Sequence, residues 1–269
     1  MIKFGIIGCG NMGGAMLRQL LKRGIFAPQE VLCADKNPQL LAQLKDELGV
    51  RTTPDNQEAA KAPTVLLAVK PQFIQSVADE IHGAIAKDAL VLSIVTGCSL
   101  SSLQAMLDLP DGAVIRVMPN TPALVGEGVL AACKSSQVTD AQWQFAFSML
   151  SCMGLAQEVN ENQMDAVTGL SGSSPAFAFL FLEALSDAGV RGGLPRDMAL
   201  RFAAQTMLGS AKLALETGMH PGQLKDMVTS PAGTTIEGVA ALEKGGFRFA
   251  VMDAVNAAME RARELGGKK

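Results

Sequence analysis

Tyrosine is absent from this chain of 269 residues, so no tyrosine can serve it as a proton donor. The only histidines, His82 and His220, lie far apart in the sequence and do not form the ligand set of a zinc site, so we expect no metal. The five cysteines are scattered and include no CxxC pair: Cys9, Cys33, Cys98, Cys133 and Cys152. This pattern is typical of a reducing cytosol rather than of a disulfide framework.

The sequence is also poor in charge and in long hydrophobic runs. Charged residues make up 18% of it and the net charge is −3, which argues against a nucleic acid or an anionic membrane as partner. The most apolar run, residues 175–182, is followed by Glu183 and is too short to span a bilayer. The N-terminus enters a strand pattern directly, without a charged targeting region or a cleavage site. We therefore expect a cytoplasmic protein whose partner is a small molecule.

Short β-branched runs alternate with helical patterns through the first 160 residues. The runs predict strands at residues 3–7, 31–34, 65–69, 90–94 and 114–117, with further strands at 129–133 and 156–159. Helical periodicity predicts helices at residues 11–22, 38–48, 71–86, 99–107 and 141–153. This alternation is typical of βαβ units and predicts an α/β Rossmann-type N-terminal domain over residues 1–160.

The pattern becomes entirely helical beyond that point. Helices are predicted at residues 163–170, 176–189, 196–217 and 247–265, so residues 161–269 are expected to form an all-α C-terminal domain. The helix that follows Pro175 is apolar on nearly all sides, which indicates a helix buried almost all round. A domain of this size has difficulty burying such a helix alone, so we expect dimerisation through it; a central helix in a monomeric bundle is the alternative.

A glycine-rich turn, Gly8-Cys9-Gly10-Asn11-Met12-Gly13, follows the first predicted strand and opens the first predicted helix. In a dinucleotide-binding turn the first glycine makes the bend, the second lets the backbone approach a pyrophosphate, and the third lets helix and strand pack closely. The helix N-terminus adds free N–H groups and the positive end of its dipole. These six residues are therefore predicted to bind a dinucleotide; a glycine turn without a ligand is the alternative.

The residues after the second predicted strand bear on the choice of coenzyme. Asp35 stands 22 residues beyond Gly13, where an acidic side chain would accept hydrogen bonds from the ribose hydroxyls of NADH. Lys36 comes next and would instead receive the 2′-phosphate of NADPH. A polar turn that merely ends the strand is the third interpretation, and the sequence leaves the choice of coenzyme open.

Two further loops follow predicted strands. Ala68-Val69-Lys70-Pro71 ends one strand, and Asn120-Thr121-Pro122 comes shortly after another. Open parallel sheets bind their ligands outside the carboxyl ends of the strands, so we expect both loops to line the coenzyme site. A solvated Lys70 and a plain turn at Asn120 are the alternatives.

Small polar residues near the C-terminus, Ser230-Pro231-Ala232-Gly233-Thr234-Thr235, lead into a helical pattern. Thr234 or Thr235 would cap that helix, with Glu237 in its first turn. A helix that starts with small residues exposes backbone N–H groups, which suit a substrate carboxylate. Local chemistry leaves a carboxylate site and a well-capped helix equally open.

The longer stretch that contains this loop, residues 221–243, resembles the signature of the pyrroline-5-carboxylate reductase family. Further matches lie in order along the chain, at residues 8–13, 68–71, 118–123, 171–176 and 245–248. The resemblance implies reduction of 1-pyrroline-5-carboxylate to L-proline, the last step of proline biosynthesis, with NADPH or alternatively NADH. It also implies a Rossmann domain and a helical domain that interlocks with a second subunit, in a homodimer that some members build into a decamer.

The resemblance also implies roles for individual residues. Thr235 is expected to donate a hydrogen bond to the ring nitrogen, and backbone N–H groups near Gly233 and Thr234 are expected to hold the carboxylate. Ser230 and Ser173 complete the expected substrate site, although residues 171–174 would equally serve only to cap the apolar helix. The implied coenzyme residues are Gly8, Cys9, Gly10, Asn11, Met12, Gly13, Asp35, Lys36, Ala68, Val69, Lys70, Pro71 and Asn120.

Two positions depart from the family pattern. Ala232 stands where the family commonly has glycine, which predicts that this position does not need a positive φ. Phe177 stands where many members have tyrosine. The β-hydroxyacid dehydrogenases share the two-part layout, but their catalytic lysine has no counterpart in residues 169–181 of this chain. A non-catalytic sensor of a dinucleotide or an imino acid is the other alternative.

Overall fold

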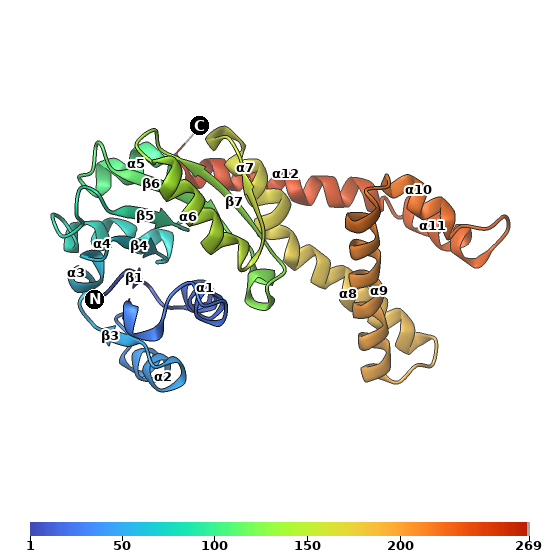
Figure 1. The fold of residues 1–269 in the computed structure, drawn as a ribbon. Coiled ribbons are helices and arrows are strands. Elements are labelled where there is room, and N and C mark those ends of the chain that lie inside the picture. Colours follow the sequence, from blue (N-terminus) through green and yellow to red (C-terminus); the bar gives the residue numbers. More distant parts are fainter. Residues whose placement is uncertain (268–269) are drawn as a thin grey trace. The chain divides into compact units, whose positions relative to one another are not determined.

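The computed structural model describes residues 1–267 and divides into two compact units. The first unit is Met1–Gly172 together with the stretch from Ala258 onward, and the second is Ser173–Ala257. The first is α/β and the second is helical, which confirms the predicted fold class (Figure 1). The units divide after Gly172 rather than after residue 160, because the helical turns between these points pack on the first unit. A Cβ on Gly172 would lie only 2.4 Å from Met118 Cε.

The first unit contains a single sheet of eight strands: β1 (Phe4–Ile7), β2 (Val31–Ala34), β3 (Arg51–Thr53), β4 (Thr64–Leu67), β5 (Leu90–Ser93), β6 (Ala113–Met118), β7 (Gly128–Lys134) and β8 (Gly154–Glu158). Their order is β3-β2-β1-β4-β5-β6-β7-β8, and all neighbours are parallel except the antiparallel pair β6 and β7. The chain reverses its direction of winding between β1 and β4. Open α/β sheets bind ligands at such a switch point.

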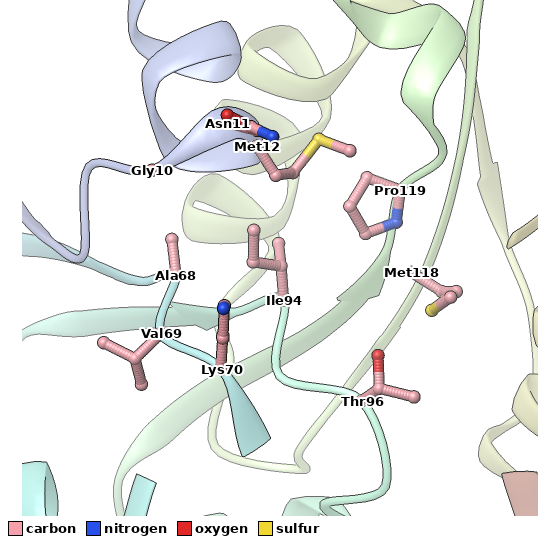
Figure 2. Close-up of a pocket in the computed structure, with 10 residues that line it drawn as sticks. All are labelled: Gly10, Asn11, Met12, Ala68, Val69, Lys70, Ile94, Thr96, Met118 and Pro119. Atoms are coloured by element: carbon pink, nitrogen blue, oxygen red, sulfur yellow. The ribbon is translucent and has the colours of Figure 1, made fainter. Parts of the chain in front are cut away.

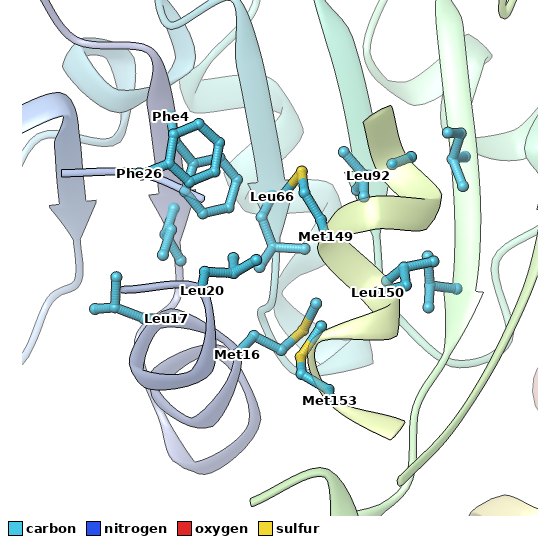
Figure 3. Packing of buried hydrophobic residues seen from close by; sticks show 14 of the residues in the cluster. Phe4, Met16, Leu17, Leu20, Phe26, Leu66, Leu92, Met149, Leu150 and Met153 are labelled. Carbon is cyan, nitrogen blue, oxygen red and sulfur yellow. The ribbon is translucent and has the colours of Figure 1, made fainter. Parts of the chain in front are cut away.

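Helices cover both faces of this sheet: α1 (Asn11–Lys22), α2 (Pro38–Leu48), α3 (Asn56–Ala60), α4 (Ile74–Glu80), α5 (Leu100–Met106), α6 (Asp140–Ser151) and α7 (Met164–Val167). Phe4 and Ile6 of β1 join one buried cluster and Ile7 joins the other, because successive strand residues point to opposite faces. Figure 3 shows the first cluster, in which Met16 of α1 and Met149 of α6 pack over the sheet. Burial on both faces explains why the central strands β1, β2, β4 and β5 are almost continuously apolar.

The structure departs from the predicted elements where backbone chemistry overrides the apolar pattern. The helix predicted for residues 71–86 is too long. It begins as a 3₁₀ turn at Pro71–Phe73 and α4 ends at Glu80, shortly before Gly83 with its φ of +70°. The short elements β3 and α3 were not predicted. The helix predicted at residues 163–170 continues through a π-helical segment, Thr168–Ser173, into the second unit.

The second unit consists of α8 (Ser174–Arg191), α9 (Arg196–Thr217), α10 (Pro221–Met227), α11 (Thr234–Lys244) and the first part of α12 (Phe247–Leu265). Its buried residues are only Ser186, Ala199 and Ala203 among those described. Large apolar side chains are instead exposed, among them Phe179, Leu180, Phe202, Leu208, Phe249 and Met252. Such a surface marks an interaction site. Over residues 1–267, no helix has both the length and the apolar character needed to cross a bilayer.

Candidate active site

The glycine-rich turn between β1 and α1 has the shape that a pyrophosphate requires. Gly8 has a φ of +89°, and a Cβ there would lie 2.7 Å from the Ala68 carbonyl oxygen. A Cβ on Gly13 would lie 2.2 Å from the Gly8 carbonyl oxygen, so helix and strand approach more closely than a side chain permits. Gly10 differs, because a Cβ there would meet no protein atom within 4 Å. The open side of Gly10 is therefore where the turn leaves room for a phosphate.

The N-terminus of α1 is suited to an anion. Gly10 is its N-cap residue, and no side chain caps the N–H groups of the first turn. The N–H groups of Gly8 and Cys9 are already used, by the Ala34 carbonyl oxygen and by Asp35 Oδ2 at 2.8 Å. The donors left for a phosphate are therefore those of the helix itself, where the helix dipole adds a partial positive charge.

A hollow of about 490 Å³ lies beside this turn, at the carboxyl ends of β4, β5 and β6 (Figure 2). Its walls bring together residues from four separate strand ends: Gly10, Asn11, Met12, Ala68, Val69, Lys70, Ile94, Thr96, Met118 and Pro119. Lys70 thus lines the hollow, and Pro71 begins the 3₁₀ turn that follows it. Sequence reasoning missed Ile94 and Thr96, although they follow β5 as Ala68 follows β4.

A second hollow, of about 460 Å³, adjoins the first and shares Gly10 and residues 68–70 with it. Its other walls come from the end of β2 and from α3 and α4, and they include Asp35, Lys36, Asn56, Phe73 and Glu80. A phosphate-binding turn with a hollow on either side fits the two halves of a dinucleotide. The residues present therefore fit a nicotinamide coenzyme.

Asp35 is held by the backbone on both of its carboxylate oxygens. Oδ2 accepts the Cys9 N–H, and Oδ1 accepts the Asn37 N–H at 2.9 Å. The carboxylate keeps lone pairs for a ribose hydroxyl, but two backbone donors already fix its orientation.

Lys36 is held by residues from distant elements. Its Nζ donates to Glu80 Oε1 at 2.6 Å and to the Pro54 carbonyl oxygen at 3.2 Å. Glu80 Oε2 accepts a second hydrogen bond, from Asn56 Nδ2 at 2.9 Å. Partial burial acts to raise the pKa of Glu80, but the hydrogen bonds from Lys36 and Asn56 hold that pKa below its ordinary value.

Asn120 is a buried connection between three segments of the first unit. Its Oδ1 accepts the Val129 N–H at 2.9 Å, and its Nδ2 donates to the Ser171 carbonyl oxygen at 3.1 Å. One N–H of the amide is not used by these bonds. Asn120 therefore ties the π-helical segment to the loop after β6, and its predicted contact with the coenzyme stays a prediction.

The loop from Ser230 to Thr235 contains a conformation that the sequence interpretation had ruled out. Ala232 has a φ of +54°, so the expectation that this position avoids positive φ is wrong. The expectation that a threonine caps the following helix is also wrong, because Gly233 is the N-cap residue and has no Cβ. The Gly233 N–H donates to the Ser230 carbonyl oxygen at 3.0 Å, and a Cβ on Gly233 would lie 2.2 Å from Ser230 Oγ.

Thr234 and Thr235 occupy the first turn of α11, which no side chain caps. Both are exposed, and no hydrogen bond of the Thr235 hydroxyl is found within residues 1–267. The first-turn N–H groups beside these threonines are not capped by a side chain, and the predicted binding of a carboxylate there stays a prediction. Ser173 is the N-cap residue of α8, but its side chain makes no capping hydrogen bond, and the choice between a capping and a substrate-binding role for residues 171–174 stays open.

The cysteine of the phosphate-binding turn is a buried thiol. A hydrogen bond with Cys33, together with burial, raises the pKa of Cys9 well above its ordinary range. Burial likewise raises the pKa of Cys133 to about 11. Thiols of this kind stay protonated near neutral pH and do not act as nucleophiles.

Comparison with known proteins matches most of the chain to described families. Residues 161–265 match the description "Pyrroline-5-carboxylate reductase dimerisation", and residues 3–97 match "NADP oxidoreductase coenzyme F420-dependent". Pyrroline-5-carboxylate reductase of Synechocystis sp. is 48% identical over 268 residues, covering 99% of both chains. The Escherichia coli K12 reductase is 44% identical over 98% of both chains. The crystal structure of Plasmodium falciparum pyrroline carboxylate reductase with NADP bound has a TM-score of 0.89 at 32% identity, covering 98% of both chains.

Proposed function

The chain belongs to the pyrroline-5-carboxylate reductase family, and from this premise we propose how its own residues perform the family's reaction. It is an NADP-dependent oxidoreductase that reduces the C=N bond of 1-pyrroline-5-carboxylate to give L-proline, the last step of proline biosynthesis. NADH is a compatible alternative coenzyme. The observation that carries this function is the likeness to curated reductases over nearly the whole chain, which includes both the glycine turn and the loop at residues 230–235.

We assign the coenzyme to the two adjoining hollows of the first unit. The nicotinamide coenzyme, when bound, supplies the hydride. The open side of Gly10 and the uncapped N–H groups of α1 would hold its pyrophosphate. Further contacts are proposed for Gly8, Cys9, Asn11, Met12, Gly13, Asp35, Lys36, Ala68, Val69, Lys70, Pro71 and Asn120.

We assign the imino acid to the loop that precedes α11. The first-turn N–H groups at Thr234 and Thr235 would bind its carboxylate, and Gly233 and Ser230 would shape the loop around it. Ser173, at the start of α8, is proposed as a further contact.

The proposed catalytic group is the Thr235 hydroxyl, which donates a hydrogen bond to the ring nitrogen. Hydride addition to the imine carbon would leave negative charge on that nitrogen unless it is protonated or hydrogen-bonded. The Thr235 hydroxyl would donate to the lone pair of the neutral imine nitrogen and orient the ring, and the nitrogen would take a proton from solution as the hydride adds to the carbon. Catalysis then rests on the orientation of two bound reactants and on local electrostatics.

We propose that the helical region forms a homodimer, which further assembly would extend to a decamer. The match to a dimerisation family over residues 161–265 supports this arrangement, as do the exposed apolar side chains of the second unit. The same match begins at residue 161, where the sequence predicts the substrate and dimerisation domain (161–269) to follow the coenzyme domain (1–160), although residues up to Gly172 pack with the first unit. The five free cysteines support a cytoplasmic location.

Substitution of Thr235 tests the proposed mechanism. Thr235→Ala should lower kcat/KM for the imine by about tenfold to a thousandfold, the range of one lost transition-state hydrogen bond. Thr235→Ser keeps the hydroxyl and should recover most of the rate. Thr234→Ala is the matched control, because it removes a neighbouring hydroxyl but keeps the backbone N–H. Kinetics near wild type in Thr235→Ala would refute the role of this residue.

A parallel assay separates this function from the alternatives. NADPH oxidation should be followed with 1-pyrroline-5-carboxylate and with a semialdehyde of the kind that β-hydroxyacid dehydrogenases reduce. Turnover of the imine alone is the expected result. Turnover of the semialdehyde alone, or of neither compound, would overturn the proposal.

A further inference from the structure

The second hollow holds a charged cluster whose members come from three separate elements. Lys36 follows β2, Asn56 begins α3, and Glu80 ends α4. The two oxygens of Glu80 are divided between the other two side chains, Oε1 to Lys36 and Oε2 to Asn56. Glu80 lies 44 residues from Lys36 in the sequence and reaches it only because α4 packs beside the end of β2.

Lys36 is therefore not a free cation. Of the three protons on its Nζ, one is donated to Glu80 and one to the Pro54 carbonyl oxygen, which leaves one for a ligand. Its positive charge is neutralised by a carboxylate at 2.6 Å. A phosphate that approaches Lys36 must also approach Glu80.

The second hollow has no excess of positive charge to favour a 2′-phosphate. The charged side chains that line it are two acidic, Asp35 and Glu80, and two basic, Lys36 and Lys70, and Glu80 is the one in contact with Lys36. An uncharged ribose hydroxyl meets no repulsion from these carboxylates. The second hollow thus contains Lys36, which attracts a 2′-phosphate, and Glu80, which contacts Lys36 and repels that phosphate.

We propose that Glu80 sets the coenzyme selectivity of this enzyme: by engaging Lys36, it weakens the preference for NADPH and lets NADH compete. The proposal rests on the coenzyme site assigned above, though not on the imine substrate or on Thr235. Glu80 acts as a specificity-determining residue at a distance in sequence from the strand end where such residues are usually sought.

Binding of coenzyme fragments tests this directly. Adenosine 2′,5′-bisphosphate and adenosine 5′-monophosphate differ only in the 2′-phosphate, and calorimetry gives their affinities without any turnover. Glu80→Gln keeps the shape and the hydrogen-bond acceptor for Asn56 but removes the charge. It should raise the affinity ratio of bisphosphate over monophosphate by about tenfold at low salt. The gain should shrink as the ionic strength rises.

Two variants serve as controls. Lys36→Gln should lower the same ratio by at least about tenfold, because it removes the attractive charge. Glu30→Gln makes the same change as Glu80→Gln in another lysine–glutamate pair, Lys3 with Glu30, outside both hollows, and should leave the ratio unchanged. The ratio of kcat/KM for NADPH over NADH should follow the binding ratio in every variant.

The outcomes are distinct. A ratio that is unchanged or lowered in Glu80→Gln, with the wild-type protein binding both fragments, would overturn the role of Glu80 alone. Binding of neither fragment to the wild-type protein would overturn the assigned coenzyme site as well. If the fragment ratios are as expected but the imine is not turned over, the role of Glu80 is supported and the proposed substrate is wrong.

Discussion

Replacing Ala232 by glycine tests whether the substrate loop carries backbone strain. Ala232 has a φ of +54°, in the left-handed region. A residue with a Cβ pays about 1–2 kcal/mol for this conformation, whereas glycine adopts it without that penalty. Glycine also gives the unfolded chain more freedom, which opposes the gain by about 0.4–1 kcal/mol. The net stabilisation of Ala232→Gly alone is therefore between about 0 and 1.6 kcal/mol, too wide a range to decide the question.

A matched substitution isolates the folded-state effect. Ala240→Gly makes the same chemical change at an exposed site inside α11, where glycine costs about 1 kcal/mol relative to alanine. The added freedom of the unfolded chain is the same in both variants. The difference between their free energies of unfolding therefore reports the effect of glycine on the folded backbone at the two positions. We expect Ala232→Gly to be more stable than Ala240→Gly by about 1–2 kcal/mol.

Urea unfolding followed by circular dichroism measures this difference. Both variants must be compared at one protein concentration, because the stability of an oligomer depends on concentration. Equal stabilities, or a less stable Ala232→Gly, would refute the strain assigned to this loop. Asp108 has a φ of +53° in the first unit, and Asp108→Gly should gain less, since aspartate tolerates this conformation better than alanine does.

Three further predictions concern the first unit. Gly13→Ala should lower the free energy of unfolding by about 1–3 kcal/mol, because the turn leaves no room for its Cβ. Gly10→Ala should keep the melting temperature of the wild type and lose affinity for NADP⁺ in calorimetry. The reverse pattern would contradict the geometry of the turn. Glu161→Gln should lower the free energy of unfolding in urea by about 1–3 kcal/mol, because it leaves the buried Arg116 without the carboxylate that lies 3.5 Å away. An unchanged free energy of unfolding would show that this ion pair does not stabilise the fold. The lowered pKa of Glu80 means that its ionised form stabilises the fold above the unfolded-state pKa of about 4.3, and that this contribution is lost as the pH falls through the lowered value. Glu80→Gln should therefore be less stable than wild type in urea at neutral pH, and the difference should shrink as the pH falls below about 4.3. A difference that stays constant with pH would refute this linkage.

The centre of the sheet was predictable because β1, β2, β4 and β5 are buried on both faces and are therefore almost continuously apolar. The ends of α2 were predictable as well, because Asn37 caps its start and Gly49 ends it in a left-handed conformation. β3 escaped notice because it is a three-residue strand in which only Thr53 is buried. The helix predicted after Pro71 is too long because apolar residues continue at helical spacing past Gly83. The left-handed conformation of Gly83 is not compatible with a continued helix.

In the candidate site too, features that depend on local sequence were predictable, and contacts between distant segments were not. The glycine turn was predictable, since the absence of a Cβ is a property of the sequence itself. The engagement of Lys36 by Glu80 was not, because it exists only when α4 has packed against the sheet. The error at Ala232 has a different origin. An alanine in place of a glycine shows that the fold tolerates a Cβ there, and this says nothing of the φ that the chain adopts.

The assigned coenzyme site and the proposed substrate loop, each within its own unit, differ in how much buried structure supports them. The coenzyme site lies on strands that are fully buried, so its backbone N–H groups are fixed by the core of the first unit. The substrate loop belongs to a unit with three buried residues among those described, and α11 has none. A threonine that must meet a ring nitrogen within hydrogen-bond distance needs an ordered support. In the proposed dimer, the exposed apolar surface of the second unit would be covered by another subunit, which would give the loop that support. We therefore expect assembly to matter for the geometry of the proposed substrate site, and to matter far less for coenzyme binding.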